Sequence, residues 1–378
     1  MPDPFMAQLA ALDARSRLRR LAPRAGHDFA SNDYLGFARD PAIARAVAEA
    51  VARGVPVGSG GSRLLRGNAP EHERLEARAA AVFGSEAALF LANGFAANGA
   101  ILSALPGPGD LIVADALIHA SAHDGMKLGR ARVAMAAHND AQAFDDAIRQ
   151  WRARGGTGRP WIVAETLYSM DGDRAPVDDL ADIAARHDAM LLLDEAHATA
   201  VHGPGGRGLA AHLEGRSPGG SAVIMLHTCG KGLGVEGALV TAARPVIDLL
   251  ANRGRGFVFS TAPSPLMAVA VEAALERMLA ADAERAQLAA LIDHAARHIC
   301  APLGLPAPAS QILPVIIGDD ARTMAVAGAL QAAGFDVRGI RPPTVPRGTA
   351  RLRISLTRNV TGDVIAALGA ALREAMAA

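Results

Sequence analysis

The chain has 378 residues, of which 51% are hydrophobic and 20% are charged, a balance that is ordinary for a globular protein. Because single hydrophobic cores seldom grow beyond roughly 250–300 residues, we expect two folded units. Lysine plus arginine equals aspartate plus glutamate at 38 each. This balance argues against nucleic acid as a partner, because nucleic-acid proteins usually carry excess positive charge.

The cysteine content and the apolar segments indicate a cytoplasmic protein. Cys229 and Cys300 are too few for a disulfide framework or a thiolate metal site, which fits a reducing compartment. Acidic and basic residues interrupt the apolar stretch in the first 26 residues, unlike in a signal peptide. No run of about 18 apolar residues predicts a spanning helix. We therefore expect a soluble protein with no metal and no membrane contact.

The predicted elements begin with an amphipathic helix over residues 4–20, which has apolar positions at Phe5, Leu9 and Leu12 and which we expect to pack on something larger. Between about residues 40 and 270, alanine-rich helical segments alternate with short apolar runs. These runs are AALFLA, DLIVA, WIVAE, AMLLLDE, AVIML and GALVTA. Short strands that are apolar on both faces and separated by helices predict a large, mainly parallel sheet in an α/β domain.

After the turn-rich segment STAPSP, the pattern changes to a long helix over residues 264–300 and the strands ILPVIIG and RLRISLT. This change predicts a smaller α+β domain at the C-terminus. We therefore divide the chain into an N-terminal helical segment (1–30), a large α/β domain (31–270) and a small domain (271–378).

Polar residues follow the apolar run AMLLLDE, at the strand end where open α/β sheets bind ligands. Asp194 and His197 lie at this end, and Lys231 lies between glycines in the later segment CGKG. A pyridine cofactor accounts for these residue types together. An aspartate beside the ring nitrogen keeps that nitrogen protonated, and a lysine amine forms a Schiff base.

A phosphate site is predicted where the segment NGFAANGA follows the apolar run AALFL. A turn from a strand into a helix presents main-chain amides to an anion, here the amides of Gly94 and Phe95. The hydroxyl of Thr228, three residues before Lys231, is a further candidate donor.

Seven motifs occur in the order of the α-oxoamine synthase family of pyridoxal 5′-phosphate (PLP) enzymes, and the chain resembles that family over nearly its whole length. They are SNDYLG (31–36), GSGGSR (58–63), NGFAAN (93–98), IHAS (118–121), SMDGD (169–173), DEAH and CGKG. The resemblance implies the PLP-dependent transferase fold of the aspartate aminotransferase-like type I. It also implies a homodimer with shared active sites.

Residues 340–357, IRPPTVPRGTARLRISLT, most closely resemble the branch of this family that acts in biotin biosynthesis. The resemblance implies decarboxylative condensation of L-alanine with pimeloyl-CoA or a pimeloyl acyl carrier protein, giving 8-amino-7-oxononanoate, CO₂ and a free thiol. The alternative within the family is a synthase that uses glycine and another acyl-CoA. An alternative of another class is a non-catalytic PLP-binding protein.

The resemblance also implies roles for individual residues. Lys231 would hold PLP, Asp194 would pair with the pyridine nitrogen, His197 with the ring hydroxyl, and His119 would stack on the ring. The other implied cofactor contacts are Gly94, Phe95 and Thr228 at the phosphate, Ser169 beside the cofactor, and Ser260 of the partner subunit with Thr261 of the partner subunit. The implied substrate contacts are Arg353 and Asn32 for the amino-acid carboxylate, and Arg19 and Thr344 along the acyl chain, with Arg17 and Arg20 as alternatives to Arg19.

Two positions depart from the family pattern without touching an assigned role. Glu195 stands where a second aspartate is frequent, and Asn93 stands where a small residue is frequent.

DEAH also occurs as the metal-binding box of ATP-driven helicases, but the GxxxxGK[ST] loop that such proteins need is missing from the sequence. Simpler alternatives are a helix cap for Asp194, a solvated loop lysine for Lys231 and an exposed strand face for Arg353.

Overall fold

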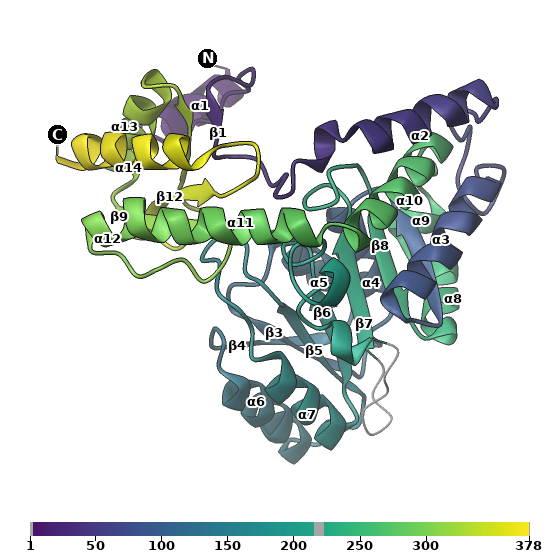
Figure 1. Cartoon of the computed structure of the whole chain (residues 1–378). Coiled ribbons are helices and arrows are strands. Elements are labelled where there is room, and N and C mark those ends of the chain that lie inside the picture. Colours follow the sequence, from purple (N-terminus) through teal and green to yellow (C-terminus); the bar gives the residue numbers. More distant parts are fainter. Residues whose placement is uncertain (1–2, 215–222, 378) are drawn as a thin grey trace. The chain divides into compact units, whose positions relative to one another are not determined.

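The computed structural model describes residues 3–214 and 223–377, and the chain forms two compact units. The large unit comprises residues 35–168 and 174–282, and the small unit comprises residues 1–34, 169–173 and 283–378 (Figure 1). The domain boundaries predicted after residues 30 and 270 stay a prediction. In the described part of the chain, every helix is too short or too polar to cross a membrane.

The large unit is built on a seven-stranded sheet in the order β2-β8-β7-β6-β5-β3-β4. The strands are β2 (Ala87–Leu91), β3 (Leu111–Asp115), β4 (Arg132–Ala136), β5 (Pro160–Glu165), β6 (Met190–Asp194), β7 (Val223–Thr228) and β8 (Ala238–Ala242). β8 is antiparallel to both of its neighbours, whereas the pairs from β7 to β4 are parallel. This architecture confirms the predicted α/β fold with a mainly parallel sheet, and it gathers the carboxyl ends of six strands at one edge.

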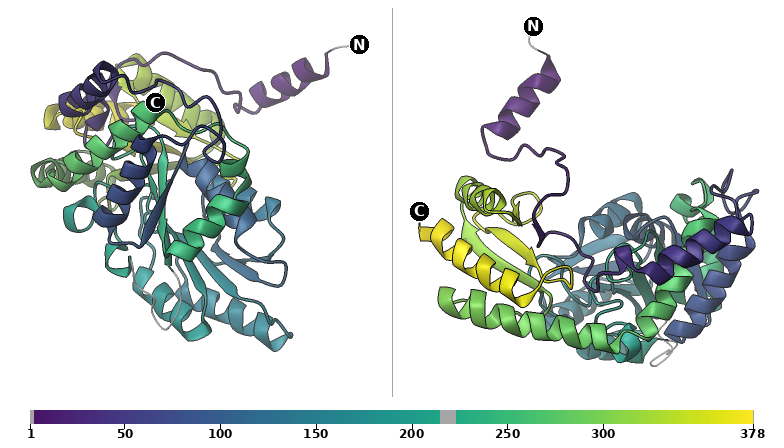
Figure 2. Two further views of the ribbon diagram at one scale, coloured as in Figure 1. Left: turned by 90° about the vertical axis from the view of Figure 1, so that its right-hand side faces the viewer. Right: turned by 45° about the horizontal axis from the view of Figure 1, so that its top comes forward.

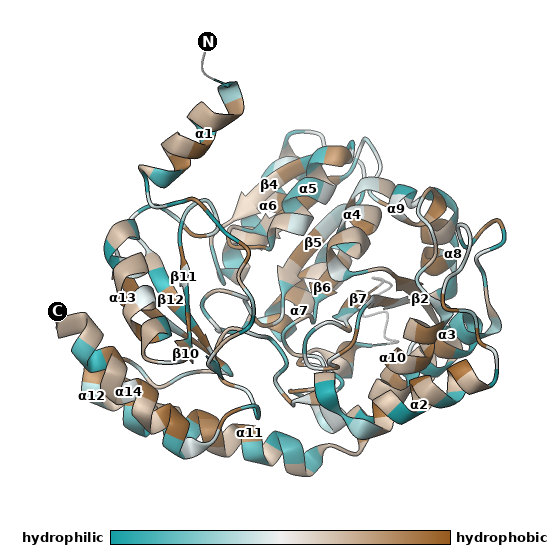
Figure 3. Cartoon of the chain, turned by 90° about the horizontal axis from the view of Figure 1, so that it is seen from above, coloured by the Kyte–Doolittle hydropathy of each residue, from teal (hydrophilic) through white to brown (hydrophobic). Residues whose placement is uncertain are grey.

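Helices cover both faces of this sheet because both faces of its central strands are apolar. One face packs against α4 (Gly94–Ala104), α5 (Ala120–Leu128), α8 (Arg244–Arg253) and α9 (Arg255–Val258). The other face packs against α6 (Ala141–Ala153) and α7 (Val177–His187). Helix α10 (Pro265–Leu279) packs on both α2 (Pro41–Ala52) and α3 (Pro70–Phe83). In Figure 3 the sheet strands are largely brown, whereas α2 alternates between teal and brown.

The small unit contains a three-stranded antiparallel sheet in the order β11-β12-β9. Its elements are β9 (Ile312–Gly318), β11 (Arg338–Ile340), β12 (Ala350–Ser355), α11 (Asp282–Ala295), η5 (Ala296–Cys300), α12 (Ala301–Leu303), α13 (Asp320–Ala332) and α14 (Gly362–Ala377). The short strands β1 (His27–Asp28) and β10 (Phe335–Asp336) pair in parallel. Leu313, Ile354 and Leu368 are buried in its core.

Two predicted helices differ from the structure, and one strand of the large sheet was missed. The first helix, α1 (Pro4–Asp13), is shorter than predicted, because Ser16 takes a positive φ of 54° that a helix does not allow. No residue of α1 is buried, and an extended segment follows it (Figure 2). The helix predicted over 264–300 breaks between Leu279 and Asp282. Strand β4 was not predicted, because it is a mostly exposed edge strand.

Candidate active site

The predicted cofactor residues of the large unit gather where β6 and β7 end. Asp194 ends β6 and Thr228 ends β7, and both side chains are buried. His197 follows β6 and is also buried. Its Nε2 atom lies 2.8 Å from Nζ of Lys231, in the loop after β7. The structure therefore brings the predicted lysine and histidine into direct contact.

Asn98 orients the carboxylate of Asp194. The Asn98 side-chain amide donates to Oδ2 of Asp194 at 2.9 Å, and the main-chain N–H of Ala196 donates to Oδ1 at 2.9 Å. Asn98 also donates to the hydroxyl of Ser121. The hydrogen bond from the N–H of Ala196 is the one expected if Asp194 only capped a turn. The hydrogen bond from Asn98, in helix α4, holds the second carboxylate oxygen as well. Asn98 was not predicted as a site residue, although it is the last residue of the NGFAAN motif.

His119 caps helix α5, where its Nδ1 accepts a hydrogen bond from the main-chain N–H of Ser121 at 3.2 Å. Burial is the main cause that lowers the pKa of His119. The carboxylate of Asp194 opposes this shift, and the charge of Lys231 adds to it. The imidazole is therefore neutral near pH 7, and its flat face is suited to stacking on an aromatic ring.

The predicted phosphate residues meet at the start of α4. A methyl group at Gly94 would place its Cβ 2.5 Å from Cγ2 of Thr228, so the first turn of α4 touches the end of β7. Asn93 caps this helix by accepting a hydrogen bond from the N–H of Ala96 at 2.8 Å, which explains the departure from a small residue. Phe95 belongs to the same turn and is exposed. The turn therefore presents helix-terminal amides next to Thr228, whose hydroxyl donates to the carbonyl of Ala196 at 3.4 Å.

Glu195 has a structural role that explains its departure from the family pattern. It is fully buried, and it accepts hydrogen bonds from the Thr166 hydroxyl and from the N–H groups of Leu209 and Ala210. Burial raises the pKa of Glu195, and the nearby His227 with these hydrogen bonds opposes the shift. The carboxyl therefore fastens the 209–210 segment to the strand end.

Arg353 lies on β12 of the small unit and is buried, so the exposed-face alternative is wrong. Its Nε donates to the carbonyl of Ser169 at 2.6 Å, and one terminal nitrogen donates to Oδ1 of Asn32 at 3.0 Å. The other terminal nitrogen donates to the hydroxyl of Ser355. The small unit thus brings together Asn32, Arg353 and Ser169.

The small unit also distinguishes the three candidate arginines near residue 19. A terminal nitrogen of Arg19 donates to the Thr344 hydroxyl at 3.3 Å. Arg17 instead forms an ion pair with Asp320 at 2.8 Å, and Arg20 is exposed. Arg19 is therefore the arginine that lies beside the second predicted acyl-chain residue.

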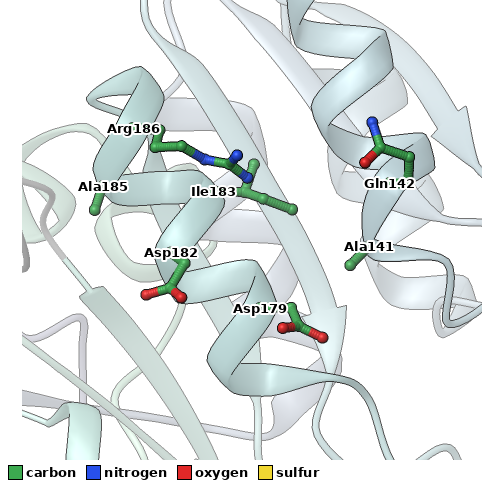
Figure 4. A pocket seen from close by; sticks show the side chains of 7 residues that line it. All are labelled: Ala141, Gln142, Asp179, Asp182, Ile183, Ala185 and Arg186. Carbon is green, nitrogen blue, oxygen red and sulfur yellow. The ribbon is translucent and has the colours of Figure 1, made fainter.

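A depression of about 570 Å³ lies between α6 and α7, where Gln142, Asp179 and Arg186 line it (Figure 4). The depression between α6 and α7 holds none of the predicted site residues. Ser260 and Thr261 lie exposed between α9 and α10, so their role in a partner subunit stays a prediction. Across residues 3–214 and 223–377, no group of three or more histidine, cysteine, aspartate and glutamate side chains could hold a metal ion.

Comparison with known proteins identifies the family. The family described as aminotransferase class I and II matches residues 26–369. The chain belongs to this family. Curated relatives are named 8-amino-7-oxononanoate synthase. The relative from Anaeromyxobacter dehalogenans strain 2CP-1 is 42% identical over 93% of this chain and 90% of its own length, and that from Burkholderia cenocepacia strain HI2424 is 42% identical over 99% and 95%. These matches confirm the resemblance drawn from the sequence motifs.

Solved structures of the aminotransferase-like fold match 93% or more of the chain. Serine palmitoyltransferase from S. paucimobilis, solved with a bound PLP–myriocin aldimine, has a TM-score of 0.88 and 25% identity, and the match covers 100% of this chain and 98% of that one. An 8-amino-7-oxononanoate synthase from Francisella tularensis has a TM-score of 0.76 and 25% identity, with 93% and 98% covered. The family and these structures confirm the predicted fold class.

Proposed function

We propose that the chain is a PLP-dependent C-acyltransferase that condenses L-alanine with a pimeloyl thioester. The products are 8-amino-7-oxononanoate, CO₂ and a free thiol. The observation that carries this proposal is the contact of Lys231 with His197 at the polar edge of the large sheet. The chain has two lysines, and the other one, Lys127, is exposed and pairs with Asp124. The names of the relatives at 42% identity support the choice of substrates.

The residues at this edge fit PLP in kind. Lys231 offers a primary amine, and Asp194 offers a carboxylate fixed by two donors. Thr228, which carries a hydroxyl, lies against the first turn of α4, where main-chain amides are available. The lack of a side chain at Gly94 is what allows that turn to approach Thr228. These groups match three parts of PLP: the amine of Lys231 matches the aldehyde, Asp194 the pyridine nitrogen, and the α4 turn with Thr228 the phosphate.

When bound, PLP supplies an electron sink for negative charge at the α-carbon of the amino acid. We propose that Lys231 binds PLP covalently in the resting enzyme and moves the proton at the α-carbon of alanine once its amine is free. Asp194 would hold the proton of the pyridine nitrogen, and His197 would bind the ring hydroxyl. His119, as a neutral imidazole, would orient the ring by stacking.

For the substrates, we propose that Arg353 and Asn32 bind the carboxylate of alanine. A guanidinium already fixed by hydrogen bonds to the Ser169 carbonyl and to Asn32 is pre-organised for paired hydrogen bonds with a carboxylate. Arg19 and Thr344 would lie along the acyl chain. The thiol carrier would be coenzyme A or an acyl carrier protein, since both present the same acyl carbon.

We also propose a cytoplasmic homodimer. Large apolar side chains are exposed on the large unit at Val57, Leu65, Phe95 and Phe259, with relative exposures of 74%, 86%, 53% and 74%. Exposed residues of this kind are typical of surfaces that another subunit covers. Phe259 directly precedes Ser260 and Thr261 in the chain, which supports a role for these two residues across such an interface.

The substrate assignment is tested by offering the PLP-loaded protein L-alanine or glycine with pimeloyl-CoA or acetyl-CoA. We expect thiol release only with L-alanine and pimeloyl-CoA, and mass spectrometry should detect 8-amino-7-oxononanoate. Turnover with glycine in place of alanine would indicate the other synthase class. A protein that binds PLP and turns over none of the pairs would support the non-catalytic alternative.

A glycine substitution tests the phosphate site. Gly94→Ala should weaken PLP binding by a factor of about 10 or more, because the new methyl group would collide with Thr228 and move the first turn of α4. Gly99→Ala is the matched control in the same helix, since no atom lies within 4 Å of its added Cβ. The control should leave PLP affinity unchanged and stabilise the fold by up to about 1 kcal/mol. Equal PLP affinities of both variants, measured by absorbance titration, would refute the proposed phosphate site.

A further inference from the structure

Three hydrogen bonds in a row join His119 to Asp194 inside the large unit. The side-chain amide of Asn98 donates to Oδ2 of Asp194 at 2.9 Å and to the Ser121 hydroxyl at 3.0 Å. The Ser121 hydroxyl lies 2.8 Å from Nδ1 of His119. Asp194, Asn98 and Ser121 are buried, with relative exposures of 7%, 3% and 1%. These bonds, the His119–Asp194 network, are therefore largely protected from competition by water.

The direction of each hydrogen bond in this network follows from the carboxylate at one end. A carboxylate oxygen accepts and does not donate, so the part of the Asn98 amide beside Asp194 is its NH₂ group. The second proton of this NH₂ group is donated to the Ser121 oxygen. The hydroxyl proton of Ser121 therefore points at Nδ1 of His119.

The donors at Nδ1 determine where the proton of His119 lies. The main-chain N–H of Ser121 also donates to Nδ1, at 3.2 Å, and this group cannot reverse its direction. A neutral imidazole carries one proton and an imidazolium carries one on each nitrogen, so a proton on Nδ1 would face this N–H in either form. The proton therefore lies on Nε2, which forms no hydrogen bond within residues 3–214 and 223–377.

We propose that Ser121 is a positioning residue that keeps the His119 ring neutral, protonated on Nε2 and fixed in orientation for stacking on PLP. This inference rests on the proposed function, in which His119 stacks on the ring and Asp194 holds a proton on the pyridine nitrogen. A protonated pyridine ring is positive, and an imidazolium stacked on it would be repelled. Asp194 thus acts twice, directly on the ring nitrogen and, through Asn98 and Ser121, on the stacking histidine.

The charges around His119 agree with this role. Burial contributes most to lowering the pKa of His119, and the carboxylate of Asp194 opposes this effect. Positive charge on Lys231 or His123 lowers the pKa further, and helix α4, which packs against α5, carries no charged residue. A hydrogen bond donated to the neutral form of a base disfavours its protonation. Loss of the Ser121 hydroxyl should therefore raise the pKa of His119.

The proton of His119 can be observed by ¹⁵N NMR of the PLP-loaded protein with labelled histidine rings, in which His119→Gln identifies the signals. In the wild-type protein near pH 7, we expect a proton on Nε2 and none on Nδ1. Ser121→Ala should raise the midpoint of the ring titration by about 0.5 pH unit or more, the size expected for one hydrogen bond. A proton on Nδ1 of the wild-type protein, or an unchanged midpoint in Ser121→Ala, would overturn the proposal.

Two further variants separate the hydroxyl from packing. Ser121→Thr keeps a hydroxyl and should retain the wild-type midpoint. Ser103→Ala is the matched control, because its hydroxyl donates within α4 to the carbonyl of Gly99 at 2.5 Å and lies outside the network. It should also retain the wild-type midpoint. Equal shifts in Ser121→Ala and Ser103→Ala would mean that any lost serine hydroxyl has this effect, and would overturn the proposal.

Turnover with L-alanine and pimeloyl-CoA connects the proton of His119 with catalysis. We expect the acidic limb of the kcat profile of Ser121→Ala to move to higher pH together with the titration midpoint, since the ring then gains its second proton more easily. An acidic limb that stays in place would overturn the catalytic role of this neutrality. A wild-type protein without turnover would count against the proposed function, whereas the NMR measurement would still decide whether Ser121 fixes the proton.

Discussion

Replacing Lys231 with alanine should lower the rate of condensation by a factor of about 10³ or more. On the proposed function, the substitution removes both the covalent attachment of PLP and the amine that moves the α-carbon proton, and each contribution is large in enzymes that use them. The measurement is release of free thiol from pimeloyl-CoA in the presence of L-alanine. His197 would keep its place on the strand-end turn, because the turn is held by main-chain hydrogen bonds from Ala198 and Thr199 to the carbonyl of Glu195.

Because the chain has two lysines, the proposed site of PLP attachment can be tested directly. Borohydride reduction of the PLP-loaded protein should fix the cofactor on Lys231, and peptide mass spectrometry should find no label on Lys127. Lys127→Arg is the control, because Lys127 is exposed and its ion pair with Asp124 spans 3.6 Å at the surface. A Lys231→Ala protein that retains turnover, or a label on Lys127, would remove the proposed role of Lys231.

The fold of the large unit was predictable because its strands are buried on both faces. The central strand β6 (MLLLD) and the edge strand β2 (AALFL) have every residue buried, so a plain apolar run marks both of them. The other edge strand, β4, lacks this signal, since Arg132 and Val133 are exposed. A strand is therefore recognised from an apolar run only where both of its faces are covered, whatever its place in the sheet.

The site residues were predictable where a strand end and a motif coincide. Asp194, His197 and Thr228 lie at the ends of β6 and β7, where the topology of a parallel sheet collects ligand-binding groups. Asn98 lies inside helix α4, and its importance depends on which helix face meets Asp194. A single sequence does not reveal that contact, because it joins positions 96 residues apart.

The contacts between the N-terminal segment and the turn at residues 341–344 were hidden for a similar reason. The sequence shows arginines at positions 17, 19 and 341. It does not show that the segment with the first two lies against the segment with the third. Contacts from Ser16 and Arg19 to the 341–344 turn join residues more than 300 positions apart. Long-range pairings of charged residues therefore need the structure, whereas local motifs do not.

Replacing Asp194 with asparagine should lower kcat by a factor of about 10² to 10³, a typical effect of removing one electrostatic group from an active site. The loss has two physical causes. An amide cannot hold a proton on the pyridine nitrogen. In addition, both carboxylate oxygens now accept hydrogen bonds, from Asn98 and from the N–H of Ala196, so the amide nitrogen would face one of these donors.

The Asp194→Asn variant also separates chemistry from cofactor binding, because Lys231 and the first turn of α4 remain. We therefore expect its PLP absorbance to persist while turnover falls, and we expect Asn98→Ala to lower kcat less than Asp194→Asn does, because the carboxylate is then present but less well oriented. Asp179→Asn, an exposed position on α7, is the control and should behave as the wild-type protein. Asp194→Asn with wild-type kcat would show that the carboxylate only orders the turn through Ala196, as a capping residue does.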